Sequence, residues 1–226
     1  WGRSTVGGIV GWTMGYPTNA VTQLQRLSSN NAVHANPQSG IAGGIVGQAA
    51  YTNIRHASSL GSVALDNGTP IAQGINSNCP FSYLGGIVGC ASVSVIRETR
   101  SQAYLLGPST RPIAGRPAVG GIVGRMNFTS VEHPTAAERS LSTSIIDLPT
   151  RNLPDTDERP SAGGAVGEVF ALPEIPTSSL LLNDLYWDNE RAPYAGFGRG
   201  ARTAELQQYP APAGLFAGFN FNDLWL

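Results

Sequence analysis

Residues 43–47 read Gly43-Gly44-Ile45-Val46-Gly47, and this pentapeptide occurs five times along the chain. The other copies are Gly7-Gly8-Ile9-Val10-Gly11, Gly85-Gly86-Ile87-Val88-Gly89, Gly120-Gly121-Ile122-Val123-Gly124 and, with one change, Gly163-Gly164-Ala165-Val166-Gly167. Successive copies start 36, 42, 35 and 43 residues apart. Self-similarity at a period of about 20 to 50 residues is typical of stacked repeat architectures, so the repeat is the first guide to the fold.

Each Ile-Val pair predicts a short β-strand, because β-branched residues suit a pleated sheet. The flanking glycines permit positive φ values and a close approach of two backbones where the chain turns. A strand of this length cannot stand alone. It is therefore expected to stack on the equivalent strands of neighbouring repeats, about 4.8 Å apart, in a parallel ladder.

Further strand-like stretches lie between the pentapeptides, at 51–55, 61–65, 92–96 and 142–146. Several of them alternate polar with apolar residues, which indicates one buried and one solvated face. At roughly 20 residues per turn of a solenoid, each spacing would hold about two turns. We therefore expect an all-β chain in which residues 1–182 form a right-handed parallel β-helix.

These segments resemble the GLUG-motif repeats of bacterial surface proteins. The five pentapeptides carry the resemblance, and residues 54–63 look like the second half of that repeat. The end of the chain is similar to the segment that closes such arrays, through Leu185-Tyr186-Trp187-Asp188, a turn with Gly196, Gly198 and Gly200, Thr203-Ala204-Glu205-Leu206, Phe219-Asn220-Phe221 and Trp225. The family includes adhesin-like proteins and the non-catalytic part of some immunoglobulin-A-cleaving metallopeptidases.

The last turn of a solenoid exposes apolar core and unpaired strand edges, which a cap covers. We expect residues 183–226 to form an aromatic C-terminal cap of the same domain. Its candidate residues are Tyr186, Trp187, Asp188, Phe219, Phe221 and Trp225. No comparable cap precedes the first pentapeptide, although Trp1 and Trp12 could cover part of that end. That end is expected to contact an upstream domain or another subunit.

Two features depart from the repeat pattern. The insert 147–161 contains Leu148-Pro149 and Leu153-Pro154, and proline removes a ladder donor, so we expect an exposed loop there. Ala165 replaces isoleucine in the fifth pentapeptide. The smaller side chain removes core volume and predicts less regular stacking at this position.

The composition favours many short strands and turns in one domain, with 28 glycines, 16 prolines and 13% charged residues among 226. All 14 basic residues are arginine, and 15 acidic residues leave a net charge of -1. This balance gives no electrostatic case for nucleic acid or an anionic membrane. No apolar run approaches the roughly 20 residues that cross a bilayer. Because residue 1 is tryptophan, we expect a mature or excised segment of a larger precursor.

The two cysteines, Cys79 and Cys90, flank one short segment. This arrangement fits a local disulfide bond in an oxidising compartment better than it fits metal binding. Two free buried thiols remain the alternative.

The sequence predicts no metal site, no cofactor and no catalytic residue. His34, His56 and His133 lie far apart, and none has a partner at the spacing of metal ligands. The run Gly196-x-Gly198-x-Gly200 lacks both the preceding buried strand and the lysine of a phosphate loop. Regularly spaced threonines for ice binding are also not evident, since Thr22, Thr52, Thr99 and Thr143 suggest no common register.

We therefore expect a non-catalytic, secreted or cell-surface module that acts as a stalk, filament unit or display scaffold. Its expected partners are further copies of itself in a head-to-tail assembly, an upstream domain, and a surface glycan or protein receptor. The rival hypothesis is a carbohydrate-active β-helix enzyme or a glycan-binding module. Such an enzyme needs clustered carboxylates. Residues 1–65 contain no Asp or Glu, so the insert, the cap or Asp66, Glu98, Glu132 and Glu138 would have to supply them.

Overall fold

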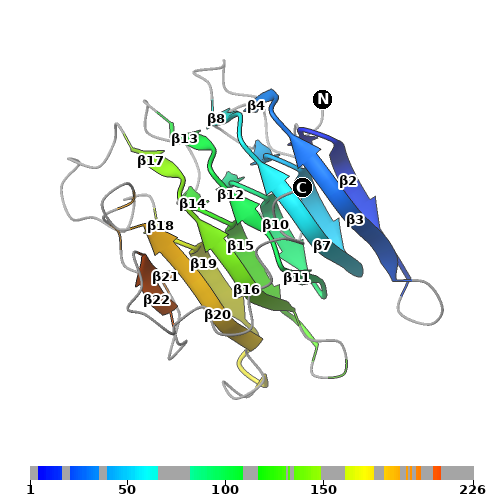
Figure 1. Ribbon diagram of the computed structural model, residues 1–226. Helices are drawn as coiled ribbons and strands as arrows, with labels where there is room; N and C mark the ends of the chain where they lie inside the picture. The colour runs from blue at the N-terminus through cyan, green and yellow to red at the C-terminus, as the bar shows by residue number, and fades with distance from the viewer. Residues whose placement is uncertain are drawn as a thin grey trace.

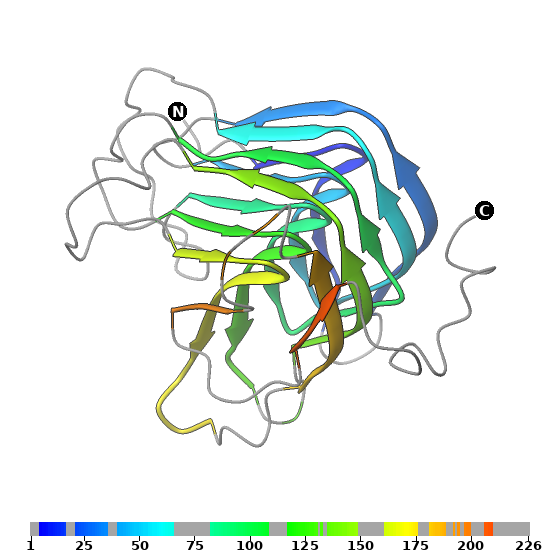
Figure 2. The same ribbon diagram turned by 60° about the vertical axis from the view of Figure 1, so that its left-hand side comes forward.

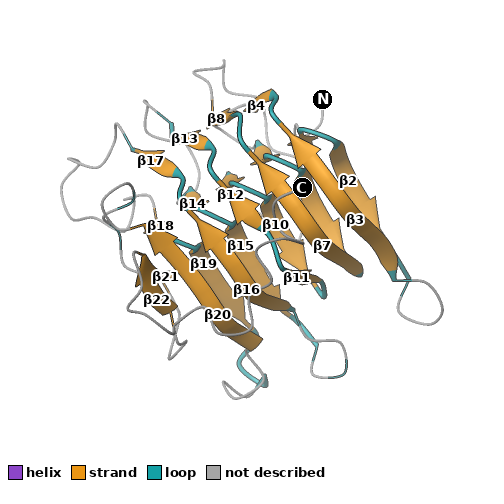
Figure 3. Cartoon of the chain, viewed as in Figure 1, coloured by secondary structure: helices purple, strands orange, loops and turns teal. Residues whose placement is uncertain are grey.

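The computed structural model describes residues 5–16, 21–35, 40–65, 82–108, 117–130, 132, 135–148, 161–175, 181–188, 192, 194, 197–199 and 206–209. These residues form β-strands joined by turns and loops, and no helix occurs among them (Figure 3). No described segment could therefore cross a membrane as a helix. All strand pairings within this part of the chain are parallel. The prediction of an all-β chain with parallel sheets is confirmed.

The strands form four sheets, each built from successive repeats. The first sheet contains β1 (Thr5–Gly7), β5 (Ile41–Gly43), β9 (Tyr83–Gly85), β14 (Ala118–Gly120) and β18 (Ser161–Gly163). The second contains β2 (Val10–Met14), β6 (Val46–Ala50), β10 (Val88–Ser92), β15 (Val123–Phe128), β19 (Val166–Ala171) and β21 (Phe197–Arg199). The third contains β3 (Thr22–Ser29), β7 (Thr52–Ser59), β11 (Val95–Arg97), β12 (Arg100–Ser101), β16 (Ala136–Ser142), β20 (Leu181–Asp188) and β22 (Leu206–Tyr209). The fourth contains β4 (Ala32–Ala35), β8 (Ser62–Leu65), β13 (Tyr104–Leu106) and β17 (Ile145–Asp147).

One pass of the chain through the sheets makes a layer. The five layers are β1–β4, β5–β8, β9–β13, β14–β17 and β18–β20, and in the third layer β11 and β12 share the place of one strand. Figure 1 shows the layers side by side, from blue for the first to orange for β20. The turned view in Figure 2 shows that successive layers follow the same curved path.

Each repeat supplies a single layer. Gly7 pairs with Gly43, which pairs with Gly85, so equivalent glycines of consecutive pentapeptides are direct neighbours. The expectation of about two turns per spacing is therefore wrong. A full layer needs four strands and their connections, and the segments between β8 and β9 and between β17 and β18 make some repeats longer than others.

The pentapeptide forms the corner between the first and second sheets, whereas a strand was predicted. In the second layer β5 ends at Gly43, Gly44 and Ile45 form a bend, and β6 begins at Val46. The Ile45 carbonyl accepts hydrogen bonds of 3.1 and 3.0 Å from the two backbone N–H groups of the Ile-Val pair in the first layer. The same bonding recurs from layer to layer, so it fixes the stacking of the corners.

The fifth corner stacks as regularly as the others. The Ala165 carbonyl accepts hydrogen bonds from Ile122 N and Val123 N at 2.8 and 3.1 Å. The prediction of irregular stacking here is wrong, because backbone groups hold the corner and do not depend on the side chain. Ala165 itself is fully buried.

The second glycine of each pentapeptide is needed for close approach. A Cβ atom on Gly86 would overlap both the Ser101 hydroxyl and the Gly121 carbonyl oxygen. None of the second glycines has a left-handed φ, so these positions use the close approach that glycine permits and not a positive φ. The serines that face these glycines are Ser29, Ser59, Ser101 and Ser142, which are register partners in the third sheet.

This row of serines divides the interior into two apolar clusters. One cluster lies between the second and third sheets and includes Ile45, Ile54 and Ile87. The other lies between the first and fourth sheets and includes Leu84 and Leu105. The serine hydroxyls bond within the interior; the Oγ atoms of Ser101 and Ser144, for example, are 2.7 Å apart.

Trp187 takes the place of the serine in the fifth layer. It is the register partner of Ser142, and a Cβ atom on Gly164 would overlap its indole ring. Trp187, a predicted cap residue, therefore reaches the interior from β20. This strand spans the predicted boundary between residues 182 and 183. The division into repeats and cap stays a prediction, since Phe219, Phe221 and Trp225 lie outside the described residues.

Two smaller expectations need correction. An exposed loop was predicted for 147–161, but Leu148 is buried with 6% exposure and does not belong to such a loop. Residues 149–160 lie outside the described part. Thr22 and Thr52 do share a register. Thr52 nevertheless points inward and is fully buried, so this pair offers no flat threonine face.

We predict that Gly86→Ala destabilises the protein by about 1–3 kcal/mol, because a neighbouring backbone oxygen cannot move aside without strain. Urea unfolding followed by circular dichroism measures the change. Gln25→Ala on the exposed side of β3 is the control and should change stability little. Equal stability of Gly86→Ala and the native chain would contradict the close approach.

We predict that Trp187→Ser, which restores the serine of the other layers, costs about 3–5 kcal/mol because it leaves a cavity beside Gly164. The variant should also lose the fluorescence of this partly buried indole. Thermal unfolding and the emission spectrum test both effects. A stable variant with an unchanged spectrum would show that Trp187 does not fill the interior.

Candidate functional site

The outward face of the third sheet carries most of the charged side chains on the described strands. In β7 the inward residues are Thr52, Ile54, Ala57 and Ser59, and the outward residues are Asn53, Arg55, His56 and Ser58. Two consecutive residues, Arg55 and His56, thus face outward. The extra residue is a bulge, since His56 has a φ of 52° and shifts the alternation by one position.

The bulge recurs in all five layers and creates a row of polar side chains, which we call the charged row. It consists of Arg26, His56, Glu98, Arg139 and Asp184, with φ values between 44° and 55°. A left-handed conformation costs a residue with a side chain about 1 kcal/mol or more, and glycine avoids this cost. The chain nevertheless has no glycine at any of these positions, and strained positions of this kind often belong to functional sites.

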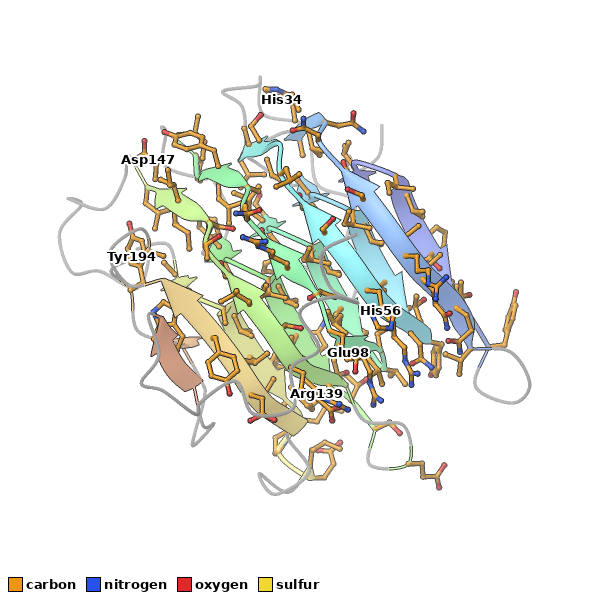
Figure 4. The ribbon with its side chains drawn as sticks, in the orientation of Figure 1. His34, His56, Glu98, Arg139, Asp147 and Tyr194 are labelled. Atoms are coloured by element: carbon orange, nitrogen blue, oxygen red, sulfur yellow. The ribbon has the colours of Figure 1, made fainter. Side chains whose placement is uncertain are left out.

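Ion pairs connect the charged row across layers. Glu98 lies between two cations, with Oε2 at 3.3 Å from His56 Nε2 and Oε1 at 3.4 Å from Arg139 Nη1. Figure 4 shows the three side chains next to one another on this face. In the adjacent row, Arg97 Nη2 lies 3.2 Å from Glu138 Oε2. These pairs are partly exposed, so each is worth at most about 1 kcal/mol.

The charges are unevenly distributed along the face. The first three layers present Arg26, Arg55, Arg97 and Arg100 against Glu98 alone, a net charge of +3 with His56 neutral. Arg26 and Arg55 have no ion-pair partner among the described residues. Acidic side chains appear from the third layer onward. The face is therefore cationic at the side of the first layers.

A buried polar cluster lies on the outer side of the first and second sheets. Arg125 donates a hydrogen bond from Nε to Asn127 Oδ1 at 2.6 Å and another from Nη1 to the Tyr83 hydroxyl. Its Nη1 is 3.4 Å from Glu168 Oε2, and its guanidinium stacks on the Phe170 ring. Removing one partner of such a buried pair is costly, so this cluster is structural in character.

The sequence contains a pattern from which this cluster could have been predicted. The residue after each pentapeptide is Trp12, Gln48, Cys90, Arg125 or Glu168, and these positions are register partners in the second sheet. An arginine and a glutamate at equivalent positions of consecutive repeats predict an ion pair once one repeat is known to form one layer.

A second polar contact joins layers on the fourth sheet. The Tyr104 hydroxyl donates a hydrogen bond of 2.7 Å to Asp147 Oδ2 in the next layer. This hydrogen bond, together with the carboxylate charge, raises the pKa of Tyr104 above its usual value. Both residues are exposed.

The predicted site residues are brought together only in part. All fifteen pentapeptide glycines, from Gly7 to Gly167, lie in the stacked corners, and the first glycine of each pentapeptide ends a strand of the first sheet. Cys90 is buried and accepts a 3.4 Å hydrogen bond from Asn127 Nδ2. Cys79 lies outside the described residues, so the predicted Cys79–Cys90 bond stays a prediction.

The candidate carboxylates and histidines form no metal or catalytic cluster that the structure describes. Glu98 and Glu138 both pair with arginines, Glu132 is exposed, and Asp66 and His133 lie outside the described residues. Figure 4 places His34 at the opposite end of the molecule from His56. No group of three or more His, Cys, Asp or Glu side chains with metal-binding geometry occurs among the described residues.

We predict that His56→Gly is more stable than His56→Ala by about 1 kcal/mol, because glycine accepts a positive φ without strain. The matched controls are Asn53→Gly and Asn53→Ala in the regular part of β7, where alanine should be the more stable. Urea unfolding of the four variants gives the comparison. The same order at both positions would argue against the bulge.

In comparisons with known proteins, no family model and no curated sequence matches the chain. The resemblance to GLUG-motif repeats therefore rests on the pentapeptides and the C-terminal segment alone.

Proposed function

We propose that the chain is a right-handed parallel β-helix, closed by residues 183–226 as an aromatic cap, and that it is a non-catalytic structural or adhesive module. We place it in a secreted or cell-surface protein, as the resemblance to GLUG-motif repeats implies. The observation that carries the proposal is the stacking of equivalent residues through five layers, with the same backbone hydrogen bonds at every corner. Such an array is a rigid support whose length grows with the number of repeats.

The distribution of side chains supports this role. The interior holds apolar clusters and hydrogen-bonded serines, so polar groups that can meet a partner lie on the outward faces. The connections from the fourth sheet back to the first sheet vary most in length. Variable connections on a constant support suit the display of binding surfaces.

The first layer supports a contact with another chain or domain. Within the described residues, β1–β4 each pair with the second layer only. Several apolar side chains of this layer are exposed, namely Ile9, Trp12, Met14 and Tyr16. Unpaired edges with apolar neighbours are normally covered. We propose that another copy of the chain, stacked head to tail, or an upstream domain covers them.

Sedimentation velocity at several concentrations tests the assembly. We expect species that grow with concentration, since a head-to-tail contact that does not close a ring produces a fibre. Trp12→Asp should reduce this growth by placing a charge at the open edge, whereas Ile145→Asp, which alters an exposed residue on the fourth sheet, should not. Monomers at every concentration would remove self-assembly from the proposal.

The enzymatic rival is tested separately by incubating the chain with a panel of polysaccharides and measuring new reducing ends. The expected result is no turnover. Product in excess of the protein would replace the structural proposal with a carbohydrate-active enzyme.

A further inference from the structure

The outward face of the first three layers of the third sheet offers a surface of one chemical kind. Its residues, which we call the cationic face, are Gln23, Gln25, Arg26, Ser28, Asn53, Arg55, His56, Ser58, Arg97, Glu98 and Arg100. Side chains of this set are charged or carry hydroxyl or amide groups. The large exposed apolar residues nearest to it, Val21 and Leu60, precede β3 and follow β7.

The cationic face keeps positive charges that no residue of the described ranges neutralises. Arg55 and Arg97 are register partners in adjacent strands, a placement in which like charges destabilise a sheet. Glu138 neutralises Arg97 from the fourth layer, but no acidic residue of the described part pairs with Arg55 or Arg26. The chain as a whole has a net charge of -1, so this concentration of arginine is local.

Unpaired hydrogen-bond donors also indicate that the cationic face could bind an anion. The Nε atoms of Arg55 and Arg97 are buried without a hydrogen-bond partner in the described structure. A guanidinium group donates in a fixed fork that fits the two oxygens of a carboxylate or sulfate. Because its Nε atom has no exposed surface, the partly exposed Arg55 would meet an anionic ligand through its two terminal nitrogens, and the ligand would supply the missing charge.

The geometry suits a linear polymer with hydroxyl groups. Ser28, Ser58 and Arg100 are register partners, and the exposed Ser58 hydroxyl donates to Ser28 Oγ at 3.1 Å. Strands of successive layers lie about 4.8 Å apart, so a chain running across them meets a new set of polar groups at each step. Protein interfaces centre on aromatic or apolar anchors, and membrane surfaces take up apolar side chains. The cationic face contains no aromatic or apolar residue of this kind.

We infer that the cationic face binds an acidic polysaccharide through its carboxylate or sulfate groups, with Arg26 and Arg55 as the anion contacts and the serines and amides as contacts to sugar hydroxyls. This inference rests on the proposed adhesive function and names its partner class. Glu98 lowers the net positive charge of the face, and the face ends where the fourth layer begins.

The test is isothermal titration of the full chain with polygalacturonate, which carries carboxylates, and with heparin, which carries sulfates. Dextran is the neutral control, and single-stranded DNA and anionic phospholipid vesicles represent the other polyanions. We expect binding to one or both acidic polysaccharides that weakens as salt is added. Binding to dextran with equal affinity, or to DNA or vesicles alone, would overturn the inference.

Matched variants locate the surface. Arg55→Gln should weaken binding about tenfold, as expected for the loss of a charged hydrogen bond. Arg139→Gln removes the same charge from the fourth layer and should change affinity about twofold or less, as expected for a charge that is already paired. Glu98→Gln should strengthen binding, a gain that misfolding cannot produce. Equal losses from the two arginine variants, or no gain from Glu98→Gln, would contradict the assignment.

The outcomes separate this inference from the proposed function. If no acidic polysaccharide binds, the inference fails, while self-assembly in sedimentation would still support the structural module. If an acidic polysaccharide binds and is also cleaved, the binding face stands and the non-catalytic proposal fails.

Discussion

The fold depends on the contact between the second glycine of each pentapeptide and the residue opposite it. At Gly86 the backbone lies so close to Ser101 and to the next corner that a single added carbon atom would overlap both. This contact brings the third and fourth sheets against the corner that joins the first two. The Ile-Val pair can then be buried on one side of the contact, and the residue before the first glycine on the other.

As a result of this packing, the charged side chains lie on the outward faces of the sheets. Core positions are occupied by small or branched side chains and by serines whose hydroxyls bond to one another. Solvent-exposed charged residues lie on the outward faces of the sheets, where stacking aligns equivalent positions of successive layers in rows. Interactions between layers are therefore set by which residues occupy the same position in consecutive repeats, as where Glu98 pairs with His56 on one side and Arg139 on the other.

Repeats and alternation predicted the all-β class and the parallel stacking, because both follow directly from self-similarity. The number of strands per repeat could not be predicted, since the corner at Gly44 and Ile45 has the composition of a strand. The charged row was missed for another reason. Bulges place left-handed backbone at residues such as His56 and Arg139, where composition indicates an ordinary strand, and only the register of the layers shows that these residues lie side by side.

The serine in the first four layers and the tryptophan in the fifth have a consequence for how such a chain can change length. An internal repeat can be duplicated or deleted as a unit, since each corner meets the same kind of neighbour before and after the change. The layer with Trp187 differs from these repeats, because an indole ring and not a serine hydroxyl lies against the second glycine of its pentapeptide. Growth and shortening by whole repeats therefore leave the corner contact unchanged among the first four layers, whereas a copy of the fifth layer would place an indole ring at that contact.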